Sequence, residues 1–130
     1  MLLEDYINEL QDDLKIDELI LKEYQLKLPG IKHKWTGRLI RHKMDINGLR
    51  KKRELLKKEL VVKIQEQSPV KLALPVIERT AEKHSEVIEI DCRIKELELI
   101  VELLEKSERT LSSASYDIKN LVEIIKLETT

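Results

Sequence analysis

The sequence predicts an all-α protein in which a short N-terminal helix precedes a long antiparallel helical hairpin, and copies of the chain form a ring-like homo-oligomer. Its 130 residues are 38% charged and 3% aromatic, with three Gly and no Phe, a composition typical of long helices. Apolar residues recur at three- and four-residue steps along most of the chain, as on one face of a helix. Two of the three prolines lie close together near the middle, where they would reverse the chain.

We divide this single domain into an acidic helical arm (1–28), a long basic helix (29–64), a connector (65–78) and a long C-terminal helical segment (79–130). In the arm the apolar positions of an amphipathic helix are Leu3, Tyr6, Ile7, Leu10 and Leu14. Pro29 is expected to end the arm and to begin the basic helix, because proline suits the first turn of a helix.

The basic helix has its own apolar seam, followed over about 35 residues, or some 50 Å at 1.5 Å per residue. The seam residues are Trp35, Leu39, Ile46, Leu49, Leu56 and Leu60. Trp35 is interpreted as a seam residue more readily than as a platform for stacking bases. Gly48 lies inside this helix and costs about 1 kcal/mol relative to Ala, without removing the periodicity.

The C-terminal segment keeps the same rhythm across some forty residues, which favours one continuous or slightly bent helix. Its apolar stripe is wider than a hairpin alone can cover, so identical subunits are expected to bury the remainder. The residues predicted to support oligomerisation are Leu97, Leu104, Leu111, Ile118, Leu121 and Ile125.

Charge is strongly polarised along the chain, although the net charge is −1. Residues 32–63 contain twelve cations and three anions, whereas both flanking regions are acidic. Acids do not alternate with the lysines, as they would on a solvated face with many ion pairs. Such a field attracts polyanions, so we predict sequence-independent contacts to nucleic-acid phosphates. The candidate DNA-binding residues are Lys32, Lys34, Arg38, Arg41, Lys43, Arg50, Lys51, Lys52, Arg53, Lys57 and Lys58.

Catalysis is not expected, because the chain lacks a nucleophile paired with a base, a glycine-rich phosphate loop and a metal motif. The histidines at 33 and 42 are not spaced as a zinc-binding pair. The single cysteine, Cys92, is expected to be a small buried hydrophobe in a reducing cytoplasm. We therefore predict no cofactor and no metal. Without a signal peptide or an apolar run of about 20 residues, the chain is expected to be soluble and intracellular.

Several stretches of the sequence resemble the UvsY family, the recombination mediator proteins of T-even-type bacteriophages. They are Leu3-Glu4-Asp5 with its acidic helix, Ile16-Asp17, and Leu28-Pro29-x-Ile31-x-His33-Lys34-Trp35 at the start of a helix rich in Lys and Arg. The resemblance implies an all-helical protomer in a hexameric or heptameric ring within the cytoplasm of an infected bacterial host. It also implies a non-enzyme that binds single-stranded DNA. The implied protein partners are a RecA-like phage recombinase and the phage single-strand-binding protein, and the mediator helps the recombinase to displace the single-strand-binding protein.

The family uses a Lys-x-Arg pair in the basic helix for DNA binding, and its C-terminal helix promotes oligomerisation. Here the corresponding residues are Lys57-Lys58-Glu59, so the resemblance carries over the lysine and not the arginine. An alternative hypothesis from the residues alone is a structural helical-bundle adaptor, whose basic helix docks on acidic helices such as 86–108. A basic helix lying on a membrane is less favoured, because only Trp35 could anchor it.

Overall fold

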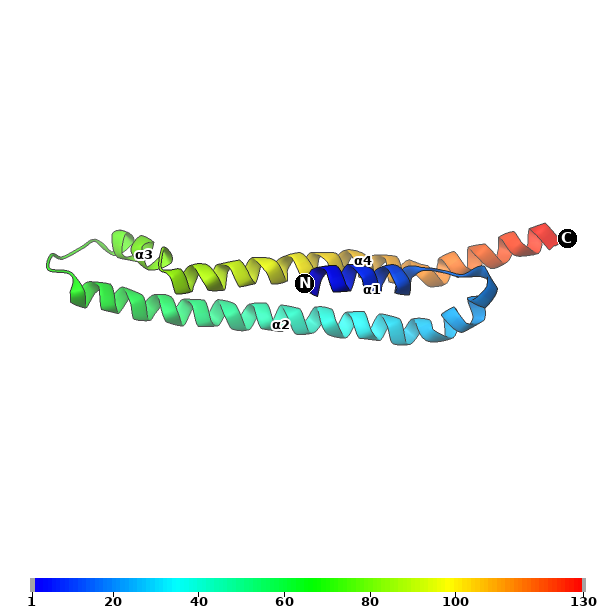
Figure 1. Ribbon diagram of the computed structural model, residues 1–130, viewed down its shortest axis with the longest axis horizontal. Coiled ribbons are helices and arrows are strands. Elements are labelled where there is room, and N and C mark those ends of the chain that lie inside the picture. The colour runs from blue at the N-terminus through cyan, green and yellow to red at the C-terminus, as the bar shows by residue number, and fades with distance from the viewer. Residues whose placement is uncertain (1, 130) are drawn as a thin grey trace. The chain divides into compact units, whose positions relative to one another are not determined.

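The computed structural model describes residues 2–129 and confirms the all-α fold. Its helices are α1 (Leu2–Leu14), α2 (Leu21–Gln67), α3 (Leu74–Glu82) and α4 (Ser85–Thr129), and a 3-10 turn lies between α1 and α2 (Glu18–Ile20) (Figure 1). The chain forms two compact units. Of the described residues, unit 1 contains 2–41 and 100–129 and unit 2 contains 42–99, so α2 and α4 contribute to both.

Unit 1 combines α1, the first part of α2 and the last part of α4. Asp17 caps the turn that joins α1 to α2, because its side chain accepts a hydrogen bond of 2.9 Å from the backbone N–H of Leu19. The core residues come from all three helices: Leu10, Tyr24, Leu28, Trp35, Leu39, Leu104, Leu111, Ala114 and Ile118. Their three- and four-residue spacing explains why each helix buries a single stripe.

The expected role of Pro29 is wrong, because α2 begins at Leu21 and continues through the proline. Proline inside a helix removes one backbone hydrogen bond and costs about 3 kcal/mol. Tyr24 and Leu28, one helical turn apart, are both buried on the preceding turns, so their packing offsets this cost. Pro29 itself is exposed, on the side away from the core.

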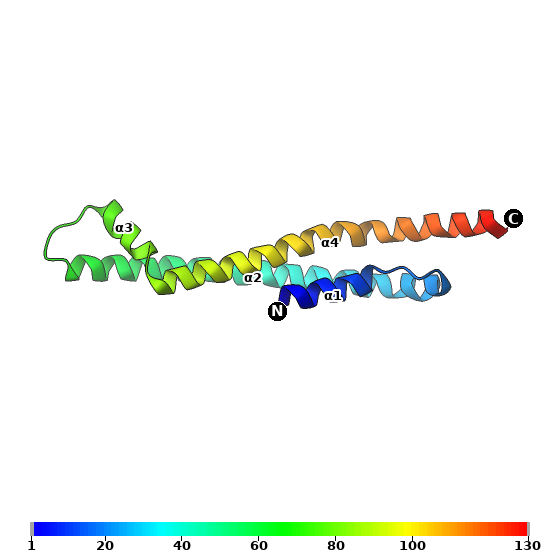
Figure 2. The same ribbon diagram turned by 45° about the horizontal axis from the view of Figure 1, so that its top comes forward.

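Unit 2 is an antiparallel arrangement of the second part of α2 with α3 and the first part of α4, as Figure 2 also shows. Residues 68–73 make the connection, and Pro75 lies in the first turn of α3, where its missing N–H has no helical partner to lose. Leu60, Ala81 and Val87 form a buried cluster against which Leu56 and Ile64 pack.

The predicted boundary at residue 79 is also wrong, because the segment after the connector is not one helix. Helix α3 ends at Glu82, and α4 then begins at Ser85 and continues to Thr129. The short helix α3 buries Ile77 and Ala81. Burial of these two apolar side chains stabilises α3 as a helix separate from α4. From Ser85 onward, the expectation of one continuous helix is confirmed.

Among residues 2–129, no helix is both long and apolar enough to cross a bilayer.

Candidate nucleic-acid interface

The cations of α2 fall into two classes that their sequence does not distinguish: some are ion-paired within their own unit, and others extend into solvent without such a partner. The structure places all of the predicted DNA-binding residues on this one helix. Which class each belongs to depends on whether a carboxylate of another helix in its unit lies within reach.

In unit 1, Lys34 and Arg38 are held by carboxylates of α1. The Nζ of Lys34 lies 2.6 Å from Asp13 Oδ2 and 2.9 Å from Glu9 Oε2, and Arg38 also pairs with Glu9. Hydrogen bonds from Lys34 and Arg38 lower the pKa of Glu9 below its ordinary value. Burial lowers the pKa of Lys34, but its hydrogen bonds to Asp13 and Glu9 outweigh that effect, so the pKa is raised.

Trp35 is part of the same cluster and is only 2% exposed. Its indole N–H donates a 2.7 Å hydrogen bond to Asp13 Oδ2, and Tyr6 packs edge-to-face against its ring at 5.3 Å. The guanidinium of Arg38 lies over both rings, 4.7 Å from the centre of Trp35 and 5.1 Å from that of Tyr6. The interpretation of Trp35 as a seam residue is therefore confirmed, since no base could reach this ring.

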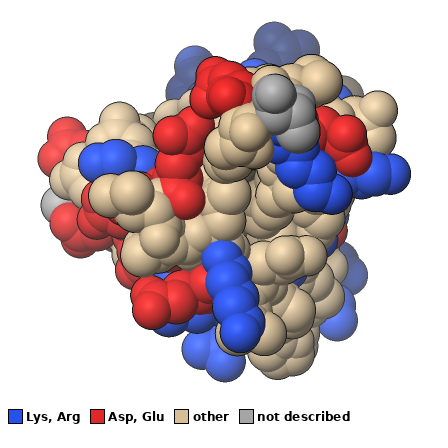
Figure 3. Space-filling view, turned by 90° about the vertical axis from the view of Figure 1, so that its right-hand side faces the viewer, with Lys and Arg blue, Asp and Glu red and all other residues tan. Residues whose placement is uncertain are grey.

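Figure 3 views the side of the protein where the turn between α1 and α2 lies, and it shows acidic and basic side chains next to one another. In unit 1 the ion pairs of Glu9 and Asp13 with Lys34 and Arg38 show that the acidic arm neutralises part of the basic helix. The arm was expected to be acidic, but its carboxylates were not assigned to particular cations of the same chain.

In unit 2, three cations of α2 follow one edge of the helix pair. Arg50 pairs with Glu98 at 3.1 Å, Arg53 with Asp91 at 2.6 Å and Lys57 with Glu82 at 3.0 Å. A hydrogen bond to Asp91 raises the pKa of Arg53. A hydrogen bond to Glu82 raises the pKa of Lys57 and lowers that of Glu82. These pairs are mostly exposed, so they fix the register of the helices more than they stabilise the fold.

The other class contains exposed cations of α2 that form no ion pair within residues 2–129. They are Lys22, Lys27 and Arg41 in unit 1 and Lys51, Lys52, Lys58 and Lys63 in unit 2. Lys32 also lacks an ion pair in the described part of the chain, and it is half-buried. Lys43 is exposed. Lys63 was counted in the basic stretch but was not among the predicted DNA-binding residues.

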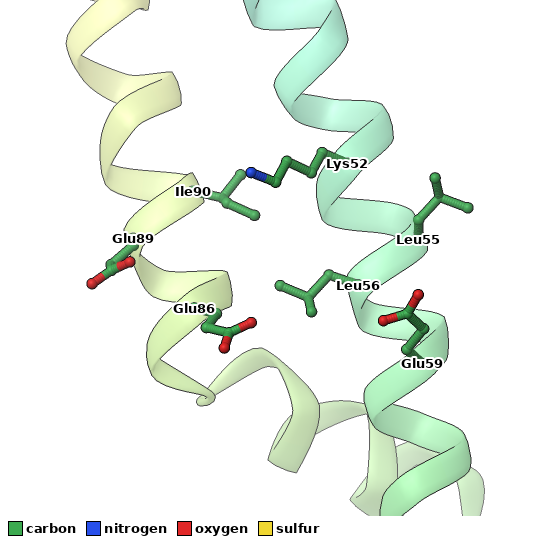
Figure 4. Close-up of a pocket in the computed structure, with 7 residues that line it drawn as sticks. All are labelled: Lys52, Leu55, Leu56, Glu59, Glu86, Glu89 and Ile90. Carbon is green, nitrogen blue, oxygen red and sulfur yellow. The ribbon is translucent and has the colours of Figure 1, made fainter.

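A groove lies between α2 and α4 in unit 2, with a volume of about 570 Å³. Figure 4 shows Lys52 pointing across it toward Ile90, with Leu56 and Glu86 also facing the space. Lys52 therefore extends into the groove toward α4, and it is placed less favourably for an external anion than Lys51 or Lys58. The four exposed cations of unit 2 are thus not equivalent.

The predicted oligomerisation residues differ in their exposure. Leu97, Leu104, Leu111 and Ile118 are buried within the protomer, so these four side chains are not displayed to a second copy. Leu121 and Ile125 are half-buried, and Ile124 and Leu127 beside them are exposed. Periodicity alone cannot separate a seam that closes within one chain from a seam that closes between chains.

Two other expectations concern reactive groups. Cys92 is exposed rather than buried, because it follows the buried Ile90 by two positions, which turns it to the opposite side of α4. Among residues 2–129, no group of three or more His, Cys, Asp and Glu side chains is arranged to hold a metal ion.

The geometry defines an all-helical protein in which several exposed lysines of α2 form no ion pair among residues 2–129. Two crystal structures of UvsY, the recombination mediator protein of bacteriophage T4, have a similar fold. One has a TM-score of 0.84 at 17% identity, over 98% of this chain and 99% of that chain. The other has a TM-score of 0.82 at 15% identity, over 100% of this chain and 99% of that chain.

No protein-family model matches the chain, and no curated protein is similar to it in sequence. At such identities the likeness to UvsY shows the fold, and the resemblance noted in the sequence is confirmed at that level.

Proposed function

We propose that this protein is a recombination mediator that binds single-stranded DNA through phosphate contacts and helps to load a RecA-like recombinase by displacing a single-strand-binding protein. It acts by binding and not by catalysis. The likeness to the T4 recombination mediator supports the class of function, and the surface of α2 supports the mode of binding.

The observation that carries the DNA contact is the row of unpaired lysines in unit 2. Lys51, Lys58 and Lys63 are exposed and form no ion pair in the described chain. Each lysine that neutralises a phosphate releases a counterion, so affinity should fall steeply with salt. Sequence readout is not expected, because lysine contacts to phosphates carry no base information. We therefore narrow the proposed DNA-binding set to the unpaired cations, with Arg50, Arg53 and Lys57 serving mainly to join α2 to α3 and α4.

The test removes charge from this set and compares it with an equal loss elsewhere. The variant K51Q/K52Q/K58Q/K63Q should bind oligo-dT weakly, and its log–log salt slope should fall by up to about 2.8, or 0.7 per phosphate contact. The control K71Q/K83Q/K95Q/K119Q removes four exposed lysines that lie outside α2 and form no ion pair among the described residues. Equal losses in both variants would show that only the net charge matters, and the proposed site would then be wrong.

Mediator activity and assembly belong to the same proposal. We propose a homo-oligomeric ring, hexameric or heptameric, to which the apolar end of α4 near Leu121 and Ile125 contributes. Many weak lysine contacts on such a ring would gain affinity through multivalency. The protein should accelerate recombinase assembly on DNA that is already covered by single-strand-binding protein. Absence of this acceleration, with DNA binding intact, would contradict the mediator role.

A second candidate function is the structural adaptor, whose basic helix docks on acidic helices. Pairs such as Arg50 with Glu98 and Arg53 with Asp91 favour it, because α2 does bind acidic residues of α4 within the chain. The adaptor requires no affinity for DNA. A filter-binding measurement with oligo-dT separates the two, since retention of DNA at low salt contradicts the adaptor alone.

A further inference from the structure

The face of α2 that points away from the core of unit 2 is not simply basic. Met44, Leu55 and Val62 are 66%, 63% and 50% exposed. Steps of eleven and seven residues place them on the same side of the helix. Lys51 and Lys58 lie in the same stripe, one helical repeat apart. The stripe therefore alternates apolar and cationic side chains, and it contains no carboxylate.

Gly48 belongs to this stripe, and no contact within the described chain requires a glycine at this position. A Cβ added at this position would have no atom within 4 Å outside the local helix backbone, and glycine costs about 1 kcal/mol relative to alanine inside a helix. A molecule that approaches the helix closely from outside would supply such a reason.

The surface around the far end of the stripe is hollowed. Two pockets of about 480 and 430 Å³ both include Lys58 and Val62 in their linings. The first is also lined by Val61, Lys57, Glu54 and Glu78, and the second by Lys63 and Glu59. A planar ring placed over Val62 would thus lie on an apolar side chain beside the ammonium group of Lys58, with carboxylates at the edges of both hollows.

From these observations we infer that unpaired bases of the bound strand lie against Met44, Leu55 and Val62 while Lys51 and Lys58 hold the adjacent phosphates. This inference rests on the proposed function and adds a base-contacting role to it. An occupant of this stripe must be anionic and must also present apolar surface. A single strand meets both conditions, whereas a duplex turns its base faces inward.

A helix of a second copy is the competing occupant. It fits less well, because Lys51 and Lys58 would then occupy seam positions, where a lysine lowers the stability of a helix pair. Methionine contacts with aromatic rings and apolar contacts with the thymine methyl group are both favourable. The stripe should therefore bind oligo-dT more tightly than a strand that carries the same phosphates without bases.

The test compares oligo-dT with an abasic oligomer of equal length by fluorescence anisotropy. The native protein should prefer oligo-dT by about tenfold, which corresponds to about 1.4 kcal/mol. The variant M44S/L55S/V62S should lose that preference and keep the native salt slope. K51Q/K58Q should weaken both ligands and reduce the slope. The control I88S/V76S/L99S changes three other exposed apolar residues of unit 2 and should keep the preference.

Equal affinity of the native protein for both oligomers would overturn the inference and leave phosphate binding intact. Failure to bind either oligomer would instead overturn the proposed function. If M44S/L55S/V62S keeps the preference but changes the oligomeric state in light scattering, a second copy covers the stripe and the inference is wrong.

Discussion

Two regions of the basic helix carry similar charge and use it differently. In residues 32–41, part of unit 1, Lys34 and Arg38 are tied to two carboxylates of α1 and to a buried indole. In residues 50–63, part of unit 2, paired and unpaired cations alternate around the helix, and four lysines face solvent without an ion pair in the described chain. The first region mainly joins α1 to α2, and the second leaves exposed lysines, as the proposed DNA contact requires.

The difference shows that the availability of a cation depends on whether a carboxylate of a neighbouring helix lies within reach of it. Arg53 and Lys57 lie next to the seam, where α3 and α4 bring carboxylates within 3.0 Å. Lys51 and Lys58 lie on the opposite side and form no ion pair in the described chain, although Glu78 of α3 lines the same hollow as Lys58. A count of charges along the sequence cannot report this distinction.

The largest expected effect is on the stability of unit 1, where Trp35, Lys34 and Arg38 contact α1. Trp35→Ala should destabilise the protein by about 3 to 5 kcal/mol, because it removes a large buried side chain and leaves a cavity. It also leaves Asp13 without the indole donor. Urea denaturation followed by circular dichroism would measure the loss. A change below about 1 kcal/mol would show that the Trp35 cluster does not organise unit 1.

The second largest expected effect is a difference in DNA binding between variants of residues 50–63 and variants of residues 32–41. K51Q/K58Q should lower the salt slope for oligo-dT by about 1.4, since two phosphate contacts are lost. K34Q/R38Q removes equal charge but should leave the slope nearly unchanged, because Glu9 and Asp13 already neutralise these cations. Anisotropy titrations at several salt concentrations would measure both. A larger effect from K34Q/R38Q would reverse the assignment of the two regions.

The stability of the contacts between α1 and the first part of α2 should also depend on pH. The pKa of Glu9 is lowered from 4.5 by hydrogen bonds from Lys34 and Arg38, so its contribution to stability is present above pH 4.5 and is lost as the pH falls below it. The pKa of Lys34 is raised from 10.5, so its contribution is present below pH 10.5 and is lost above it. Because Glu9 is partly exposed, the effect is small.

Trp35 is the only tryptophan, so its fluorescence reports on unit 1 directly. Its emission should begin to shift as the pH falls below 4.5, and Glu9→Gln should reduce that shift. An identical acid transition in the variant would show that protonation of Glu9 does not weaken the contacts between α1 and α2.

The smallest expected effect comes from glycines on exposed sides of α2. Gly37→Ala in unit 1 and Gly48→Ala in unit 2 should each stabilise the protein by about 0.5 to 1 kcal/mol, because a Cβ at either site meets nothing within 4 Å. Thermal unfolding would compare the two variants. Destabilisation by either one would mean that its glycine has an intramolecular role.

The helical class, the seam of α2 and the position of Trp35 could be predicted, because an amphipathic helix records its buried side in the spacing of Trp35, Leu39, Ile46 and Leu60. The course of α2 through Pro29 could not, since it depends on tertiary packing of Tyr24 and Leu28 that overrides a local signal. The separation of α3 from α4 depends in the same way on the burial of Ile77 and Ala81.

The sequence predicted one continuous set of free cations on α2, whereas the structure pairs several of them with carboxylates of the same chain. Lys34 and Arg53 looked like free cations because their partners, Asp13 and Asp91, are 21 and 38 positions away in the sequence. The exposed apolar residues of the outward stripe carry a detectable signal, because Met44, Leu55 and Val62 share one side of the helix. That signal becomes informative only once the buried side is known.

The most direct measurement is lysine footprinting of the native protein by acetylation and mass spectrometry, with and without oligo-dT. Without DNA, Lys34 and Lys57 should react slowly, because carboxylates hold their ammonium groups. With DNA, Lys51, Lys58 and Lys63 should become protected, while Lys71, Lys83 and Lys95 should not change. Protection confined to lysines outside α2, or spread evenly over the surface, would contradict the central claim that the outward lysines of α2 bind the phosphates.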